Sequence, residues 1–398
     1  MAKDISRRGN AQPASPMRRL EGAFLKVRHE RSRIYPLNIG QPDIETPAEY
    51  MNVYRNFEGP VIKYGPSGGI PEYRETLAGY YAGCGIDLTA EDILVTTGGS
   101  EAIIFVMAAI TDPGDEVIIS EPFYANYNGF ANMVGCKVVP VTAKAENGYA
   151  LPPIAEIADR ITDRTRAIMI CNPGNPTGYA YSRDEINALK ALCRENDLFL
   201  VSDEVYREFV YEGSHNSIMA DPGFEDHGII VDSLSKRFSL CGARMGQVAS
   251  KNRQVIDAIL KMGQARLCPP TVEQYAAMEV HKLGASYFDG VRAEYRKRRD
   301  VVFDGLMAMD GVFCKKPNGA FYVQAKLPVK DAFDFASWML TEFQQDNETV
   351  LVAPGNGFYA TQGLGMDEVR IAYIINCDEL ARSMELMKAA LQAYPGAR

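Results

Sequence analysis

The chain has 398 residues, more than one hydrophobic core usually serves, and we therefore expect a large and a smaller domain. With 46% hydrophobic and 23% charged residues, its composition is that of an ordinary globular protein. The formal net charge of −9 provides no general field that would attract nucleic acid or anionic lipid, so small-molecule chemistry is the better interpretation.

The cysteines and histidines indicate a reduced protein without a metal centre. The eight cysteines are scattered singly and form no CxxC pair, which is typical of the thiols of a cytoplasmic protein. The four histidines form no HExxH pattern or cluster, so we expect no metal site. The longest apolar run, Ala102–Ile110, is too short to span a bilayer. We expect a cytoplasmic protein whose partners include neither nucleic acid nor a membrane.

The N-terminal residues are predicted to form an arm. Residues 1–35 are polar and basic, and a helix-like stretch runs from Arg18 to Glu30. An extended arm leading into a short helix and a solvated tail fit this composition equally well. Gly40, in the segment IGQPD, allows backbone to approach a ligand closely, unless the segment is a simple turn.

A glycine-rich loop, residues 63–71, comes next and precedes a helical stretch at 72–82. Tyr64 lies at the mouth of this loop. It either hydrogen-bonds an anionic ligand or packs at one edge, as most loop tyrosines do.

The segment TGGSE, residues 97–101, lies between a β-branched run and an apolar helix that reaches Ile110. A strand, a glycine pair and a helix start aim free backbone N–H groups and the positive end of a helix dipole at one point. This arrangement suits a phosphate. Ser100 could instead be only an N-cap, which requires no ligand.

From there to about residue 250, strand-like runs alternate with helices. The expected strands are Glu116–Ser120, Lys137–Val141, Ala167–Cys171, Leu198–Ser202, Ile229–Asp232 and Gln247–Ser250. The expected helices are Tyr124–Val134, Pro153–Ile161, Ser182–Asn196 and Asn252–Gly263. Such alternation indicates a largely parallel sheet covered by helices on both faces, and ligands bind at the carboxyl ends of strands in such sheets.

The residues that follow these strands are therefore candidate site residues. They are the aromatic Tyr124, the amide Asn175, the carboxylate and phenol of Asp203 and Tyr206, and Lys236. Each has an ordinary alternative: a core aromatic, a turn, a helix cap with a packed tyrosine, and a lysine on a strand-end loop. A lysine directly after a buried strand is unusual, because lysine is strongly hydrated. A desolvated lysine loses its proton more easily, and the free amine can condense with an aldehyde to form a Schiff base.

The C-terminal part is predicted to begin with a long helical stretch, Pro270 to about Met309. Strands are expected near Ala320–Gln324, Thr349–Val352 and Val369–Ile375, and an amphipathic helix at Asp378–Tyr394. Arg370 opens the last of these strands. It is either surface decoration or a group that grips a carboxylate with two parallel hydrogen bonds.

These candidates match what pyridoxal phosphate requires of a protein. The phosphate needs the amides and hydroxyl at Gly99 and Ser100, with Ser233 and Arg244 to neutralise its charge.

The ring of this cofactor accounts for the other candidates. It needs an aromatic cover, Tyr124, and a carboxylate at its nitrogen, Asp203. Asn175 and Tyr206 would hydrogen-bond the ring oxygen. Lys236 would hold the cofactor as a Schiff base and later carry a proton from Cα of the substrate. Two half-reactions of this kind move an amino group from an amino acid to a 2-oxo acid.

The sequence resembles the fold-type I pyridoxal-phosphate enzymes of the aspartate aminotransferase family, in class I/II. The resemblance covers nearly the whole length and is carried, in the family's order, by IGQPD (39–43), KYGPSGGIPEYRE (63–75), TGGSE (97–101), EPFY (121–124), NPGNPTG (172–178), SDEVY (202–206), SLSKRFSLCGARMG (233–246) and RIAY (370–373).

The resemblance implies a role for each candidate. Lys236 is the Schiff-base lysine, Asp203 the partner of the ring nitrogen, Tyr206 a ring-oxygen ligand, and Arg370 the clamp on the substrate α-carboxylate. The implied cofactor-binding set is Gly99, Ser100, Glu101, Tyr124, Asn175, Asp203, Tyr206, Ser233, Ser235, Lys236, Arg244 and Tyr64, and the implied substrate-binding set is Gly40, Asn175 and Arg370.

The resemblance also implies an assembly and a domain division. It implies a homodimer with shared active sites, in which Tyr64 reaches the phosphate of the neighbouring subunit. Residues 1–45 would form the arm and part of the small domain, 46–289 the large cofactor-binding domain, and 290–398 the rest of the small domain. The expected fold is an α/β large domain with a mostly parallel sheet, and a smaller α+β domain.

Two departures from the family's pattern bear on specificity. The aromatic cover is Tyr124, where many relatives have tryptophan. Arg266 precedes a proline pair but lies closer to it than the family's specificity arginine. It is a candidate for the distal carboxylate of a substrate, or else a surface or interface residue. Aspartate or a similar amino acid is the best prediction for the donor.

Two alternatives to an aminotransferase remain at this stage. A lyase of the same fold would lose a β-substituent from the same carbanion. A non-catalytic regulatory protein that binds the cofactor would usually carry a DNA-binding region ahead of this fold. Only about 35 residues precede the fold here, too few for a winged helix.

Overall fold

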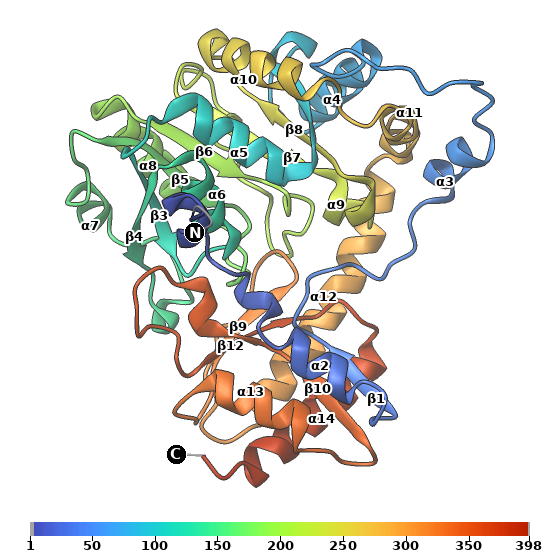
Figure 1. Ribbon diagram of the computed structural model, residues 1–398, viewed down its shortest axis with the longest axis vertical. Coiled ribbons are helices and arrows are strands. Elements are labelled where there is room, and N and C mark those ends of the chain that lie inside the picture. Colours follow the sequence, from blue (N-terminus) through green and yellow to red (C-terminus); the bar gives the residue numbers. More distant parts are fainter. Residues whose placement is uncertain (1–3, 397–398) are drawn as a thin grey trace.

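The structure is a computed structural model that describes residues 4–396 (Figure 1). A seven-stranded sheet in the order β2-β8-β7-β6-β5-β3-β4 organises most of the chain. Its strands are β2 (Ile93–Thr97), β3 (Glu116–Glu121), β4 (Lys137–Thr142), β5 (Thr165–Cys171), β6 (Phe199–Asp203), β7 (Gly228–Ser233) and β8 (Met245–Ala249). Strands β3 to β7 pair in parallel, and only β8 runs antiparallel to both of its neighbours, β2 and β7. The predicted mostly parallel sheet is confirmed.

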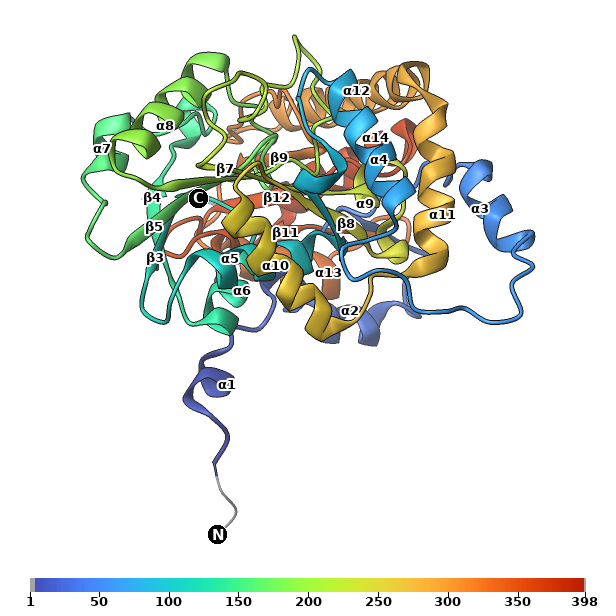
Figure 2. The same ribbon diagram turned by 90° about the horizontal axis from the view of Figure 1, so that it is seen from above.

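Helices cover both faces of this sheet, as Figure 2 shows from above. The strands carry apolar residues on both sides, and neighbouring residues point to opposite layers. Ile118 packs in the cluster that includes α4, α8 and α11, whereas Val117 and Ile119 pack in the cluster with α5, α6 and α10. The helix bounds are α3 (Ala48–Arg55), α4 (Pro71–Gly83), α5 (Gly98–Ile110), α6 (Asn126–Val134), α7 (Ile154–Ala158), α8 (Arg183–Glu195), α10 (Arg253–Arg266) and α11 (Thr271–Val280).

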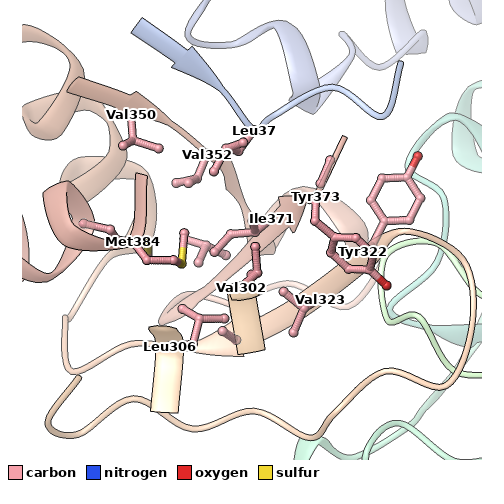
Figure 3. Packing of buried hydrophobic residues seen from close by; sticks show 14 of the residues in the cluster. Leu37, Val302, Leu306, Tyr322, Val323, Val350, Val352, Ile371, Tyr373 and Met384 are labelled. Carbon is pink, nitrogen blue, oxygen red and sulfur yellow. The ribbon is translucent and has the colours of Figure 1, made fainter. Parts of the chain in front are cut away.

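A second core lies between two smaller sheets and the C-terminal helices. In one sheet, β12 (Glu368–Ala372) lies between β11 (Ala353–Pro354) and β9 (Tyr322–Lys326); in the other, β1 (Arg33–Pro36) pairs in parallel with β10 (Glu348–Leu351). The helices are α12 (Ala285–Met307), α13 (Ala332–Thr341) and α14 (Cys377–Ala393). Their apolar faces meet in the cluster of Figure 3, which includes Leu37, Val302, Leu306, Val323, Val350, Ile371 and Met384.

The N-terminal arm connects the two parts of the molecule. It contains α1 (Arg7–Ala11), the 3-10 turn η1 (Pro16–Arg18) and α2 (Glu21–Val27). In α1, the Arg8 side chain donates a hydrogen bond to the carbonyl of Met133 on α6, 3.1 Å away. Further along, α2 packs against α13, so the arm passes from the large sheet's helices to the smaller sheets (Figure 1). Residues 1–3 and 397–398 of the predicted arm and C-terminal domain lie outside the described residues.

Two details of the predicted elements were wrong. The expected continuous helix from Pro270 to about Met309 is two helices, α11 and α12, separated by the turn at His281–Leu283. Gly284 ends this turn with a φ of 72°, a left-handed conformation that glycine adopts without steric cost. The strand expected at Gln247–Ser250 begins at Met245, which pairs with Thr97 of β2.

The predicted division at residues 45/46 and 289/290 stays a prediction. The second boundary falls within the first turns of α12. In the described part of the chain, no helix has both the length and the apolar character needed to cross a membrane.

Candidate active site

A cavity of about 290 Å³ opens at the carboxyl ends of β5, β6 and β7. Almost all the predicted site residues line it: Gly40, Gly99, Ser100, Tyr124, Asn175, Asp203, Tyr206, Ser233, Ser235, Lys236, Arg244 and Arg370. These residues come from the large sheet, from the segment after β1 and from β12. The fold therefore brings together groups separated by more than half of the chain.

Lys236 projects into this cavity from the short helix α9 (Leu234–Arg237), which directly follows β7. Its Nζ donates a hydrogen bond to the carbonyl of Gly40 at 2.7 Å. The hydroxyl of Ser233 caps α9 by accepting from the Ser235 backbone N–H at 3.0 Å. A fully buried ion pair between Asp232 and Arg237 ties the helix back to its strand. The half-buried amine is thus held on a short, well-anchored element.

Asp203 lies at the end of β6, with 6% of its surface exposed. The Tyr127 hydroxyl donates to Oδ2 at 2.8 Å, and the Val205 N–H donates to Oδ1 at 3.3 Å. Burial raises the pKa of Asp203 to about 6, and these two hydrogen bonds oppose the shift. Lys236 also lowers this pKa slightly by its charge, but Asp203 has no salt bridge among the described residues, so it is suited to pair with a positively charged group of a ligand. No helix starts here, so Asp203 is not a helix cap.

Two aromatic side chains stand beside this carboxylate. Tyr124 is half-buried in the cavity wall, and its ring meets that of Tyr127 edge to face at a centroid distance of 5.4 Å. The Tyr206 hydroxyl lies 2.8 Å from the hydroxyl of Tyr322, a residue of β9 that also lines the cavity. Figure 3 shows Tyr322 at the edge of the smaller core. A Cβ at Gly40 would lie 1.8 Å from the Tyr322 hydroxyl oxygen, so this position requires glycine.

Arg370 lies in the cavity wall between the rings of Tyr322 and Phe358, whose centroids lie 4.5 and 4.9 Å from its guanidinium carbon. It donates to Asn175 Oδ1 at 2.9 Å and to the carbonyl of Asn38. Its Nε is buried and finds no hydrogen-bond partner among the described residues. Burial lowers the pKa of this arginine. An unpaired donor on a buried cation fits an anionic ligand, because an unsatisfied buried donor is costly.

The start of α5 forms the third side of the cavity. Thr97 is the N-cap residue and Ser100 is the third residue of the helix, so the alternative that Ser100 is only an N-cap was wrong. A Cβ at Gly98 would lie 2.4 Å from Arg244 Nη2, which shows how closely the arginine approaches the helix terminus. The free N–H groups of this terminus and the Arg244 guanidinium suit a phosphate.

Three predicted residues do not line the cavity. The Glu101 carboxylate accepts a hydrogen bond from the Thr97 N–H at 2.7 Å and pairs with Arg266 at 3.6 Å, so it turns toward the helix terminus. Arg266 also donates to the carbonyl of Ser67 at 3.2 Å. Tyr64 lies elsewhere on the surface and is 80% exposed.

Some residues of the site were not predicted from the sequence. Tyr127 follows Tyr124 by three residues within the expected helix Tyr124–Val134, and this spacing was a usable signal, although α6 itself begins only at Asn126. Tyr322 and Arg18 had no such signal, because they reach the cavity from β9 and from η1, far from the large sheet in sequence.

The residues present fit pyridoxal phosphate: an amine within the cavity, a buried carboxylate with no salt bridge to any described residue, an aromatic wall and a helix terminus with an arginine. This site and the surrounding sheet define the fold type I class of pyridoxal-phosphate enzymes. The chain belongs to the family "aminotransferase class I and II", whose model matches residues 33–385. It is therefore an enzyme, an aminotransferase.

Named relatives and solved structures agree with this assignment. The chain is similar to an aspartate/prephenate aminotransferase of Thermus thermophilus, with 32% identity over 392 residues that cover 96% of this chain and 97% of the relative. An aspartate aminotransferase of Bacillus subtilis is 30% identical over 90% of this chain and 91% of its own length. The structure of the Thermus thermophilus aspartate aminotransferase with maleate superposes with a TM-score of 0.88 at 31% identity, covering 98% of this chain and 100% of that chain.

Proposed function

We propose that the enzyme transfers the amino group of an L-amino acid, with aspartate as the best donor, to a 2-oxo acid such as 2-oxoglutarate. We further propose that pyridoxal phosphate bound in the cavity serves as its cofactor. The observation that carries the proposal is the position of the Lys236 amine in the same cavity as Asp203 and Arg370. When bound, the cofactor supplies an electron sink for the charge that remains on Cα after its proton is removed.

The phosphate would be held at the start of α5. The backbone N–H groups of Gly99 and Ser100 are free donors at a helix terminus, and Ser233 and Ser235 lie beside them in the lining. Arg244 brings a permanent positive charge to the same place. Glu101, which the sequence analysis included here, would act indirectly by capping the helix through the Thr97 N–H.

The ring would lie between Tyr124 and the strand ends. Asp203 would pair with the protonated ring nitrogen, which would stabilise the negative form of the carboxylate that burial disfavours. Asn175 and Tyr206 would hydrogen-bond the ring oxygen. These contacts would fix the orientation of the ring, so that the bond to be broken at Cα could stay aligned with the π system.

Two basic side chains of the cavity would act on the substrate, Arg370 by binding it and Lys236, as a neutral amine, by removing its Cα proton. Arg370 would bind the α-carboxylate, whose oxygen would accept a hydrogen bond from the unpaired buried Nε. Lys236 would hold the cofactor covalently and, once displaced by the substrate amine, would move the Cα proton. The Gly40 carbonyl, 2.7 Å from Nζ, would orient this amine.

The decisive experiment is the replacement Lys236→Ala with Lys261→Ala as a control, because Lys261 is an exposed residue of α10. Lys236→Ala should abolish both the borohydride-reducible bond to pyridoxal phosphate and the formation of glutamate from aspartate and 2-oxoglutarate. The control should retain both. Persistence of the reducible bond in Lys236→Ala would refute the assignment. Ammonia formation without a 2-oxo acid would indicate a lyase instead.

We also propose a homodimer with shared active sites, located in the cytoplasm and divided at residues 45/46 and 289/290. An apolar surface supports the dimer: Val61 is 64% exposed, Ile62 65% and Tyr64 80%. Phe57 and Tyr275 border the same hollow. Exposed apolar patches of this kind mark protein contacts. Tyr64 would then reach the partner's cofactor phosphate.

A further inference from the structure

We propose that Glu121 is a positioning residue for Arg370. Its buried carboxylate holds the segment that carries Phe358, and the ring of Phe358 in turn fixes the guanidinium of Arg370. This inference rests on the proposed role of Arg370 as the group that binds the substrate α-carboxylate. Glu121 opens the motif EPFY, ends β3 and does not line the cavity.

The Glu121 carboxylate is fully buried and accepts hydrogen bonds from two different parts of the chain. Its Oε2 accepts from the backbone N–H groups of Ala360 and Thr361, at 2.8 and 3.0 Å. Its Oε1 accepts from the hydroxyl of Thr142, its partner on β4, at 2.8 Å. The large sheet therefore fixes one carboxylate oxygen, while the other oxygen holds the segment that leads from β11 to β12.

The backbone of Phe358 is held at the same strand end. Phe358 is the last residue of η6 (Gly355–Phe358), and its carbonyl accepts from the N–H of Phe123 at 2.9 Å. Phe123 lies two residues after Glu121, and the two N–H groups that Glu121 binds lie two and three residues after Phe358. Phe358 is fully buried between these anchors, so its ring has little freedom to move.

The position of this ring decides the direction of the Arg370 guanidinium. The rings of Phe358 and Tyr322 lie 4.9 and 4.5 Å from the guanidinium carbon. Nη1 donates to Asn175 and Nη2 to the carbonyl of Asn38, which leaves Nε for a ligand. Two parallel hydrogen bonds to a carboxylate require a defined direction of the guanidinium plane, so a displaced Phe358 ring would weaken them.

Loss of the Glu121 carboxylate would release the segment but not the strand. The N–H groups of Ala360 and Thr361 would lose their acceptor, and because an unsatisfied buried donor is costly, the segment would move until water reaches them. Strand β3 would keep its place, since it pairs with β4 on one side and β5 on the other. The expected defect therefore lies in substrate binding and not in cofactor binding.

Three variants of Glu121 separate the reach of the side chain from its charge. Glu121→Ala removes the acceptor, and Glu121→Asp keeps the charge but withdraws the oxygens by one C–C bond, about 1.5 Å. Glu121→Gln keeps the length, and its amide oxygen can accept from both N–H groups. Glu185→Ala is the matched control, because Glu185 accepts from the N–H groups of Leu151 and Ser182, at 3.0 and 2.7 Å, outside the cavity lining.

The first readout is steady-state kinetics with aspartate and 2-oxoglutarate. Glu121→Ala and Glu121→Asp should raise KM for aspartate about tenfold and change kcat less than about threefold, because Arg370 would bind the substrate and the transition state alike. Glu121→Gln and Glu185→Ala should keep KM within about twofold of the parent value. The affinity for pyridoxal phosphate should stay within about twofold in all four variants.

The second readout is the dissociation constant of propionate, a carboxylate without an amino group, measured by calorimetry. Glu121→Ala and Glu121→Asp should raise it about tenfold. If Glu121→Ala does not fold, Glu121→Asp decides the question. Unchanged KM and propionate affinity in the shortened variants would overturn the proposal, and so would an equal loss in Glu185→Ala or a parallel loss of affinity for pyridoxal phosphate. If the parent enzyme reacts with no amino acid, the proposed transamination fails, while propionate still decides the role of Glu121.

Discussion

Replacing Gly246 with alanine tests how tightly the start of α5 is packed beside β8. Gly246 is the second residue of β8 and pairs with Thr96 of β2 on one side and Ser233 of β7 on the other. An alanine Cβ would lie 2.4 Å from the carbonyl carbon of Gly98 and 2.6 Å from the nitrogen of Gly99. Ordinary contacts between such atoms are about 3.5–4.0 Å, so the peptide between these glycines must withdraw by about 1 Å.

This displacement cannot be absorbed by a side-chain rotation, because the contacted atoms are backbone. Overpacking typically costs about 1–3 kcal/mol, and for Gly246→Ala we expect about 3 kcal/mol. The displaced N–H groups are those proposed to hold the cofactor phosphate. A shift of about 1 Å in a positioning group can lower a rate about a hundredfold, and we expect a loss of this size in kcat/KM.

Gly79→Ala is the matched control. Gly79 lies in α4, and a Cβ there would have no atom within 4 Å. Alanine is the better helix former, so this variant should gain about 0.5–1 kcal/mol. Urea unfolding followed by circular dichroism, together with titration by pyridoxal phosphate, compares the two proteins. Equal stability and equal cofactor affinity of both variants would refute the reasoning.

Three further predictions concern the walls of the cavity. Burial raises the pKa of Asp203 to about 6, so its carboxyl is neutral below that pH and charged above it. The affinity for pyridoxal phosphate should therefore rise from about pH 5 to about pH 7. The variant Asp203→Asn should show no such pH dependence in equilibrium titrations. Arg370→Lys keeps the charge but loses the planar fork, so kcat/KM for aspartate should fall about a hundredfold in steady-state assays; a loss below about threefold would contradict the clamp. Gly40→Ala would place a methyl group 1.8 Å from the Tyr322 hydroxyl oxygen, so we expect the free energy of unfolding in urea to fall by about 2 kcal/mol. An unchanged midpoint of the urea transition would contradict this prediction.

The large sheet and most of the site were predictable because they follow from local sequence. Buried parallel strands are continuous apolar runs, and the residue that follows each run must lie at one edge of the sheet. Asp203 ends β6 and Lys236 lies three residues after the end of β7, so their meeting in one cavity was implied by their positions alone.

The remaining features depend on contacts between distant parts of the chain. The five residues of β8 do not reveal that this strand runs antiparallel to its neighbours. Tyr322 reaches Tyr206 only because β9 belongs to a different sheet that packs beside the first. The sequence predicted only that a helix begins at Arg18. Nothing in the arm reveals that η1 packs against η6, whose Phe358 stacks on Arg370. The break before α12 was hidden because the neighbours of Gly284, Leu283 and Ala285, are good helix formers that also suit a continuous helix.

The pairing of β1 with β10 sets an order of events during synthesis. Arg33 leaves the ribosome long before Glu348, its partner in the strand pair. Contacts of such long range form late, because the intervening chain must be made and ordered first. The nascent large sheet can assemble while the arm waits without its partner strand. The two-stranded sheet of the smaller core is therefore completed late, after the strands of the large sheet have been made.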